Sequence, residues 1–132
     1  MTKSERVILL GSGGHARVLL ESLTLAGATV AGFVAPSAEE SRLGDLAYLG
    51  NDEQLLAQGP AGVTLVNGIG SVRAPRLRQL VFEQYTAAGF EFGQVLDPRA
   101  NISPSATLGA GIQVLVGAIV GAGVHIRENA II

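Results

Sequence analysis

Apolar residues in the first 95 positions alternate between short uninterrupted runs and stretches with helical spacing. The uninterrupted runs predict strands over residues 6–11, 28–34, 62–70 and 90–96. The helical spacing predicts helices over residues 14–27, 51–59 and 75–89. Strands that alternate with helices favour parallel pairing, so this part of the chain is expected to be a small Rossmann-like α/β sheet with flanking helices.

Each predicted helix has a start signal or an apolar face. Asn51 is a good N-cap for the second helix, and Pro75 suits the first turn of the third. Residues at helical spacing predict the buried faces of the first and third helices: Val18, Leu19, Leu23 and Ala26 in the first, and Leu77, Leu80, Val81 and Tyr85 in the third.

From residue 102 onward the pattern changes to a period of six. The first position of every unit is aliphatic and the fifth is small or aliphatic, which fits neither a helix nor a flat strand. The period is that of a triangular β-helix with three six-residue sides per coil, inward aliphatic side chains and glycines at the corners. The first positions are Ile102, Leu108, Val114, Val120, Ile126 and Ile132, and the fifth are Ala106, Ile112, Ala118, Val124 and Ala130.

The same region is apolar enough to resemble a membrane helix. No charged residue lies between Arg99 and Arg127, and Gly117 and Gly121 form a G-x-x-x-G motif. The six-residue period decides against a helix, so we expect no membrane span.

Composition excludes several classes of function. Nine basic and eleven acidic residues give a net charge of −2 without a basic block, which argues against nucleic acid as a partner. The absence of cysteine excludes disulfides and thiolate chemistry, and two histidines are too few for a His-rich centre, so no metal is expected. The N-terminus lacks the pattern of a signal peptide, which favours a cytoplasmic protein.

The segment "GSGGHA" at residues 11–16 follows the first predicted strand. Gly11, Gly13 and Gly14 would let the backbone approach a diphosphate at the start of the helix, where the dipole and free N–H groups favour anions. With Ala16, the loop also satisfies a G-x-G-x-x-A dinucleotide fingerprint, so NAD is an alternative ligand.

The residues after the second strand weigh against NAD. An acidic residue there would grip the ribose of a dinucleotide, but the sequence has Ala35 and Pro36, and the first carboxylates, Glu39 and Glu40, fall in the loop.

Four segments together resemble one family of bacterial enzymes: "VILLGSGGHARVLLESL", "GFV", "NGIGSVRAPRLRQL", and the hexapeptides after "DPRANISPSATLGAG". They resemble the sialic acid O-acetyltransferase and UDP-4-amino-sugar N-acetyltransferase family over the whole chain. The resemblance implies a nucleotide-sugar-binding domain at residues 1–97 and the first coils of a left-handed β-helix at 98–132. It also implies trimers that transfer acetyl from acetyl-CoA to an amine or hydroxyl of a surface-polysaccharide sugar.

The resemblance implies a set of substrate-binding residues. Ile69, Gly70 and Ser71 would lie against base and ribose, and Arg73 would meet a phosphate or remain solvated. His15 would reach the sugar or its diphosphate, or else cap the helix, whereas His125 is expected outward at a corner. The full set is Gly11, Ser12, Gly13, Gly14, His15, Ala35, Pro36, Ile69, Gly70, Ser71 and Arg73. Because Ala35 and Pro36 stand where many relatives have an acidic residue, the identity of the nucleotide stays open: the sugar would be linked to UDP, CMP or dTDP.

The family's catalytic histidine and acid are expected beyond Ile132, with most of the acetyl-CoA groove, so these residues alone are expected to be inactive. Fewer than two coils of repeats favour a truncated chain, or an oligomer that covers the open end. A non-catalytic nucleotide-binding or oligomerisation module is the alternative, and an NAD-dependent oxidoreductase domain is a weaker one.

Overall fold

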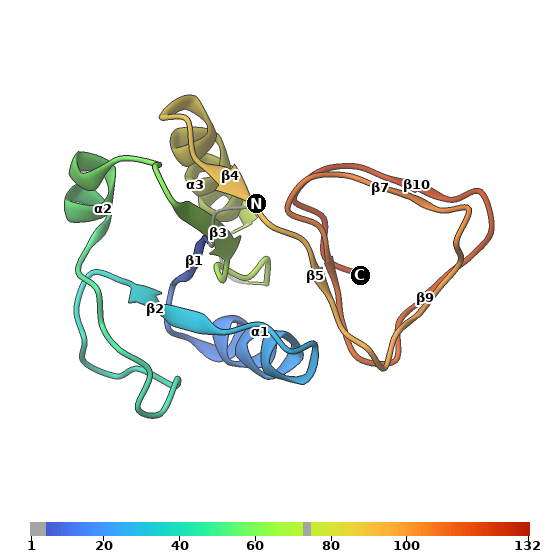
Figure 1. Ribbon diagram of the computed structural model, residues 1–132, viewed down its shortest axis with the longest axis horizontal. Helices are drawn as coiled ribbons and strands as arrows, with labels where there is room; N and C mark the ends of the chain where they lie inside the picture. Colours follow the sequence, from blue (N-terminus) through green and yellow to red (C-terminus); the bar gives the residue numbers. More distant parts are fainter. Residues whose placement is uncertain (1–4, 73–74) are drawn as a thin grey trace.

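The computed structural model describes residues 5–72 and 75–132. Its first part is a parallel sheet in the order β2-β1-β3-β4, and its second part is a triangular coil of short strands (Figure 1). The sheet strands are β1 (Arg6–Leu10), β2 (Val30–Val34), β3 (Val63–Asn67) and β4 (Glu91–Phe92), and the helices are α1 (Gly14–Leu25), α2 (Asp52–Gln58) and α3 (Pro75–Ala87). The α/β layer expected from the alternating pattern is confirmed.

The sheet has a core on each face, which explains why its strands are continuously apolar. In β1, Ile8 and Leu10 face the cluster that includes α2 and α3, whereas Leu9 faces the cluster that includes α1. At the start of α2, Asn51 and Gln54 form a reciprocal capping box, with both hydrogen bonds at 2.9 Å, so the predicted N-cap is confirmed.

The buried faces of α1 and α3 differ in part from the predicted faces. Val18 is 40% exposed and Ala26 is also exposed, while Ala16 and Ser22 join Leu19 and Leu23 in the core. In α3, Leu77 and Leu80 are 47% and 55% exposed, and the inward face carries Arg78, Val81 and Tyr85. The helix turns Arg78 inward because its guanidinium finds backbone carbonyls there, described below.

The segment 90–96, expected to be one strand, forms two strands in different parts of the fold. β4 pairs with β3 in the sheet, whereas β5 (Val95–Leu96) pairs with β8 (Gln113–Val114) in the coil. A Cβ on Gly93 would lie 2.8 Å from Cγ2 of Thr64, so this turn passes close over β3. The first strand of the coil therefore begins at Val95.

The coil is the start of a parallel β-helix with 18 residues per turn, as the six-residue period predicts. β6 (Asn101–Ile102) pairs with β9 (Ile119–Val120), and β7 (Thr107–Leu108) pairs with β10 (His125–Ile126). Ile112, Val114 and Val120 form its buried centre, surrounded by the other first- and fifth-position residues except Val124 and Ile132, which are 38% and 40% exposed. Val124 and Ile132 lie in the last coil that the structure describes, where no described strand covers them from the far side.

Glycines stand where the coil turns or where two coils touch. Gly111, Gly117 and Gly123 have φ of 69°, 77° and 72°, so the expected corner glycines are confirmed. A Cβ on Gly109 would overlap the backbone of Glu128 in the next coil.

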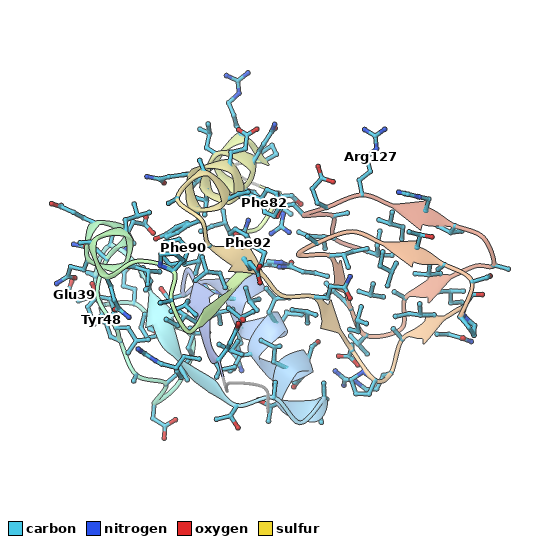
Figure 2. The ribbon with its side chains drawn as sticks, turned by 45° about the horizontal axis from the view of Figure 1, so that its top comes forward. Glu39, Tyr48, Phe82, Phe90, Phe92 and Arg127 are labelled. Atoms are coloured by element: carbon cyan, nitrogen blue, oxygen red, sulfur yellow. The ribbon has the colours of Figure 1, made fainter. Side chains whose placement is uncertain are left out.

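Helix α1 and the ring pair of Phe82 and Phe92 join the two parts of the fold. The ring centroids of Phe82 and Phe92 are 4.7 Å apart, and both rings border Gly111 at a corner of the β-helix (Figure 2). Ser22 Oγ of α1 donates to Asp97 Oδ2 at 2.6 Å, and Arg99 Nε donates to Asp97 Oδ1 at 2.9 Å. These contacts fix the β-helix beside the sheet.

Residues 108–124, which hydropathy alone would suggest as a membrane helix, form short strands and turns of the β-helix. Among the residues that the structure describes, no helix has the length and apolarity needed to cross a membrane.

Candidate functional site

A cleft of about 870 Å³ lies at the carboxyl ends of β1 and β3. Parallel strands bring their following loops to one edge of the sheet, which is where ligands of open α/β sheets bind. The cleft is lined by residues of the glycine loop, the loop after β3, the loop after β2 and the end of the chain: Gly11, Ser12, Gly13, Gly14, His15, Glu40, Arg42, Gly68, Ile69, Gly70, Ser71, Val72 and Ile131.

Close backbone approach explains the glycines of the two main loops. Gly11 has φ of 88°, and a Cβ there would lie 3.2 Å from Cδ1 of Ile69. A Cβ on Gly68 would overlap the carbonyl oxygen of Leu10, so side chains at either position would push the loops apart. The predicted residues 11–15 and 69–71 are thus brought together in one cleft.

Helix α1 begins at this cleft without a side-chain cap. Its N-cap is Gly13, with φ of −91°, and glycine has no side chain that could accept a hydrogen bond from the first turn. The N–H groups of an uncapped first turn are donors for an anion. Nothing lies within 4 Å of a Cβ built on Gly13, so a ligand can approach this turn closely.

Three of the predicted site residues do not line the cleft or cannot be placed. Ala35 is 6% exposed, its N–H donates to Gly50 O at 3.1 Å, and its carbonyl accepts from the Tyr48 hydroxyl at 3.0 Å. Pro36 is exposed and outside the cleft lining. Arg73 lies outside the described residues.

The loop after β2 contributes two charged residues that the sequence did not single out as binding residues. Arg42 and Glu40 both line the cleft, and the Arg42 N–H donates to Ser12 O at 2.9 Å, which ties this loop to the glycine loop. The only available signal was their position shortly after the second strand, where a nucleotide-binding sheet places contacts to the ribose.

A polar network runs from His15 beneath the cleft into the β-helix. His15 Nε2 lies 2.7 Å from Gln113 Oε1, and Gln113 Nε2 donates to the carbonyl of Asn67 at 2.7 Å. Arg78 Nη1 donates to the same carbonyl at 3.0 Å, and Arg78 Nη2 donates to Asn129 O at 2.8 Å. Gln113, Asn67 and Arg78 are at most 4% exposed, so the network is a buried link between sheet and β-helix.

Burial sets the charges of the two titratable groups in this network. Desolvation lowers the pKa of His15, a hydrogen bond to Gln113 opposes that shift, and the charge of Arg78 adds to it. His15 is therefore neutral at pH 7. Desolvation lowers the pKa of Arg78 to about 10, so its guanidinium stays charged.

The second histidine is elsewhere. His125 lies in β10, exposed and outside the cleft, so its outward direction is confirmed, although it sits in a strand rather than at a corner. Within residues 5–72 and 75–132, no cluster of three or more His, Cys, Asp or Glu side chains could hold a metal ion.

The model of the PglD N-terminal domain matches residues 6–85. The chain belongs to the PglD N-terminal domain family. Perosamine N-acetyltransferase PerB from Caulobacter crescentus, solved with CoA and GDP-perosamine, is similar at 34% identity over 96% of this chain, with a TM-score of 0.80. The acetyltransferase domain of PglB from Neisseria gonorrhoeae, solved with acetyl coenzyme A, is similar at 26% identity over 98% of this chain, with a TM-score of 0.84.

This PglD-family chain spans 58% of the PerB chain and 62% of the PglB domain. No curated protein matched it. The expected relation to sugar N-acetyltransferases is confirmed at the level of family and fold.

Proposed function

We propose that the chain binds a nucleotide-linked amino sugar and belongs to an enzyme that N-acetylates this sugar with acetyl-CoA. The observation that carries the proposal is the cleft itself: an uncapped helix start and two glycine-containing loops meet beside the first coils of a β-helix. PerB, whose structure contains both CoA and GDP-perosamine, has the same fold at 34% identity.

In this proposal the first turn of α1 and the Arg42 guanidinium bind the diphosphate. Backbone N–H groups and the positive helix end supply a short-range anion site, and an arginine adds charge-assisted hydrogen bonds. GDP becomes the first candidate nucleotide, ahead of UDP, because the solved complex with the amino sugar at 34% identity carries GDP. No metal is invoked.

Acetyl transfer needs a base that removes a proton from the amine and groups that stabilise the tetrahedral oxyanion. His15 is held by Gln113 and His125 is exposed in β10. We therefore propose that the first part of the chain, expected at residues 1–97, binds the nucleotide sugar, and that these 132 residues alone do not turn over acetyl-CoA. The β-helix, expected from residue 98, has its first strand slightly earlier, at Val95–Leu96.

Association into trimers is a further part of the proposal. Ile119 is 77% exposed and Val116 is 52% exposed on the outside of the β-helix, and a neighbouring subunit would cover such side chains. Light scattering after size exclusion tests it: a trimer mass supports the proposal and a monomer mass at high concentration contradicts it. We also propose that the protein is cytoplasmic, as expected of a protein that uses acetyl-CoA.

Isothermal titration tests the binding function. We expect heat from GDP or UDP and from their amino sugars. Binding of NAD alone would favour the oxidoreductase alternative, in which Glu40 of the cleft would contact a ribose. Binding of none would favour a scaffold module that only oligomerises.

A further inference from the structure

The orientation of the Gln113 side-chain amide is fixed by its surroundings. Its Nε2 lies 2.7 Å from the backbone carbonyl oxygen of Asn67, an atom that can only accept a hydrogen bond. The amide oxygen therefore faces His15. The reverse orientation would place the amide oxygen 2.7 Å from another acceptor and leave it without a donor, in a side chain that is 0% exposed.

The amide orientation decides which nitrogen of His15 carries the hydrogen. Gln113 Oε1 only accepts, so His15 Nε2, 2.7 Å away, must donate. In the neutral ring the other nitrogen, Nδ1, then has a free lone pair. Nδ1 makes no hydrogen bond to a described residue, and no buried side-chain nitrogen or oxygen among those residues lacks a partner. Nδ1 is consequently open to solvent, on a residue that lines the cleft.

We propose that Gln113 is a positioning residue for substrate recognition: it holds His15 as the Nε2–H tautomer, so that Nδ1 accepts a hydrogen bond from a donor on the sugar. The inference rests on the proposed function. A diphosphate at neutral pH offers mainly acceptor oxygens, whereas sugar hydroxyl and amino groups can donate. His15 therefore recognises the sugar, and the first turn of α1 and Arg42 bind the diphosphate.

The surrounding network gives Gln113 little freedom to turn. The Asn67 carbonyl accepts from both Gln113 Nε2 and Arg78 Nη1, at 2.7 and 3.0 Å. Arg78 is itself held by the carbonyls of Ile69 and Asn129, at 2.7 and 2.8 Å. The β-helix thus contributes to the cleft of the sheet domain in two ways, through Ile131 in its lining and through Gln113 behind His15.

The tautomer can be measured without any ligand. Long-range nitrogen–proton correlation spectra of the wild-type chain distinguish protonated from unprotonated ring nitrogens, and a His125→Gln variant assigns the two rings. We expect His15 to show a protonated Nε2 and an unprotonated Nδ1 at pH 8. A protonated Nδ1, or two averaged nitrogens, would overturn the proposal.

A Gln113→Leu variant tests the consequence for binding, with Gln94→Leu as its control. Gln94 also donates to β-helix carbonyls, those of Leu108 and Gly109, but it does not contact His15. Calorimetry would compare GDP with GDP-perosamine. We expect Gln113→Leu to weaken GDP-perosamine about tenfold, the size of one well-placed hydrogen bond, with GDP unchanged and Gln94→Leu like wild type.

An unchanged ratio of the two affinities in Gln113→Leu would overturn the role in recognition. Failure of the wild-type chain to bind either nucleotide would instead contradict the proposed function, and the tautomer measurement would still decide whether Gln113 positions His15. If the leucine variant does not fold, the wild-type spectrum decides alone.

Discussion

Replacing Arg78 with methionine should destabilise the protein because it removes the centre of the buried network. The guanidinium donates four hydrogen bonds to three backbone carbonyls, those of Asn67, Ile69 and Asn129. Methionine keeps most of the aliphatic volume, so the change acts mainly on these bonds. The Asn67 carbonyl keeps Gln113 as a donor, whereas the carbonyls of Ile69 and Asn129 have no other donor among the residues that the structure describes.

The expected magnitude follows from the two orphaned carbonyls. An unsatisfied buried acceptor costs about 1–3 kcal/mol. Ile69 and Asn129 are half-buried, so water replaces part of what their carbonyls lose, and we expect a total loss of about 1–3 kcal/mol. Removing a charge whose burial lowers its pKa to about 10 offsets part of this, which favours the lower half of that range. Because single domains are stable by about 5–15 kcal/mol, the effect should be large and measurable.

Urea denaturation followed by circular dichroism measures the change. Arg76→Met is the matched control, because Arg76 is on the same helix and exposed, and it removes the same charge. We expect the control to lie within about 0.5 kcal/mol of wild type. Equal free energies of unfolding for the two variants would refute the structural role assigned to Arg78.

Three further changes test other parts of the structure. Hydrogen bonds from Arg99 lower the pKa of Asp97, so this carboxylate stabilises the fold above its unfolded pKa of about 4 and loses that contribution as the pH falls. In Asp97→Asn, the free energy of unfolding should therefore change less with pH between about pH 2 and 5 than it does in wild type, as urea denaturation at several pH values would show. Gly109→Ala should lower the melting temperature because its Cβ would overlap the backbone of Glu128, and an unchanged temperature would contradict the stacking of the coils. Gly13→Val should leave the melting temperature within a few degrees but weaken GDP about tenfold or more, as titration would show, because its side chain would occupy free space before the first turn of α1.

The parts of the fold that were predicted correctly from the sequence are those in which apolar or glycine residues follow a clear spacing. A repeat of six over residues 102–132 matches only a coil with six-residue sides, and the structure pairs Asn101 with Ile119 and Thr107 with His125 accordingly. The glycine loop was equally easy to predict, because a buried strand followed by glycines and a helix is compatible with few local structures.

The parts that failed depend on contacts between distant segments. Apolar spacing placed Leu77 and Leu80 in the core, but α3 turns to give Arg78 three backbone carbonyls. All three lie outside the helix, two before it and one after it. A hexapeptide pattern cannot show which outward residue another domain will cover. Gln113, at a sixth position, is outward from the coil and yet 0% exposed because the sheet domain packs on that side.

Ala35 and Arg42 show the same limit in the candidate site. Position after the second strand suggested Ala35 as a contact, but its backbone is committed to Gly50 and Tyr48. The loop instead folds back so that Arg42 reaches the glycine loop through Ser12. Loop paths of this kind are set by tertiary hydrogen bonds and not by local sequence.

Calorimetric titration of the chain with GDP-perosamine, GDP, UDP and NAD is the most direct test of the ligand assigned to this cleft. We expect that a nucleoside diphosphate binds, that its amino sugar binds more tightly, and that Gly13→Val weakens both. Binding of NAD alone, or equal affinities for wild type and Gly13→Val, would contradict the assignment of this cleft to a nucleotide sugar.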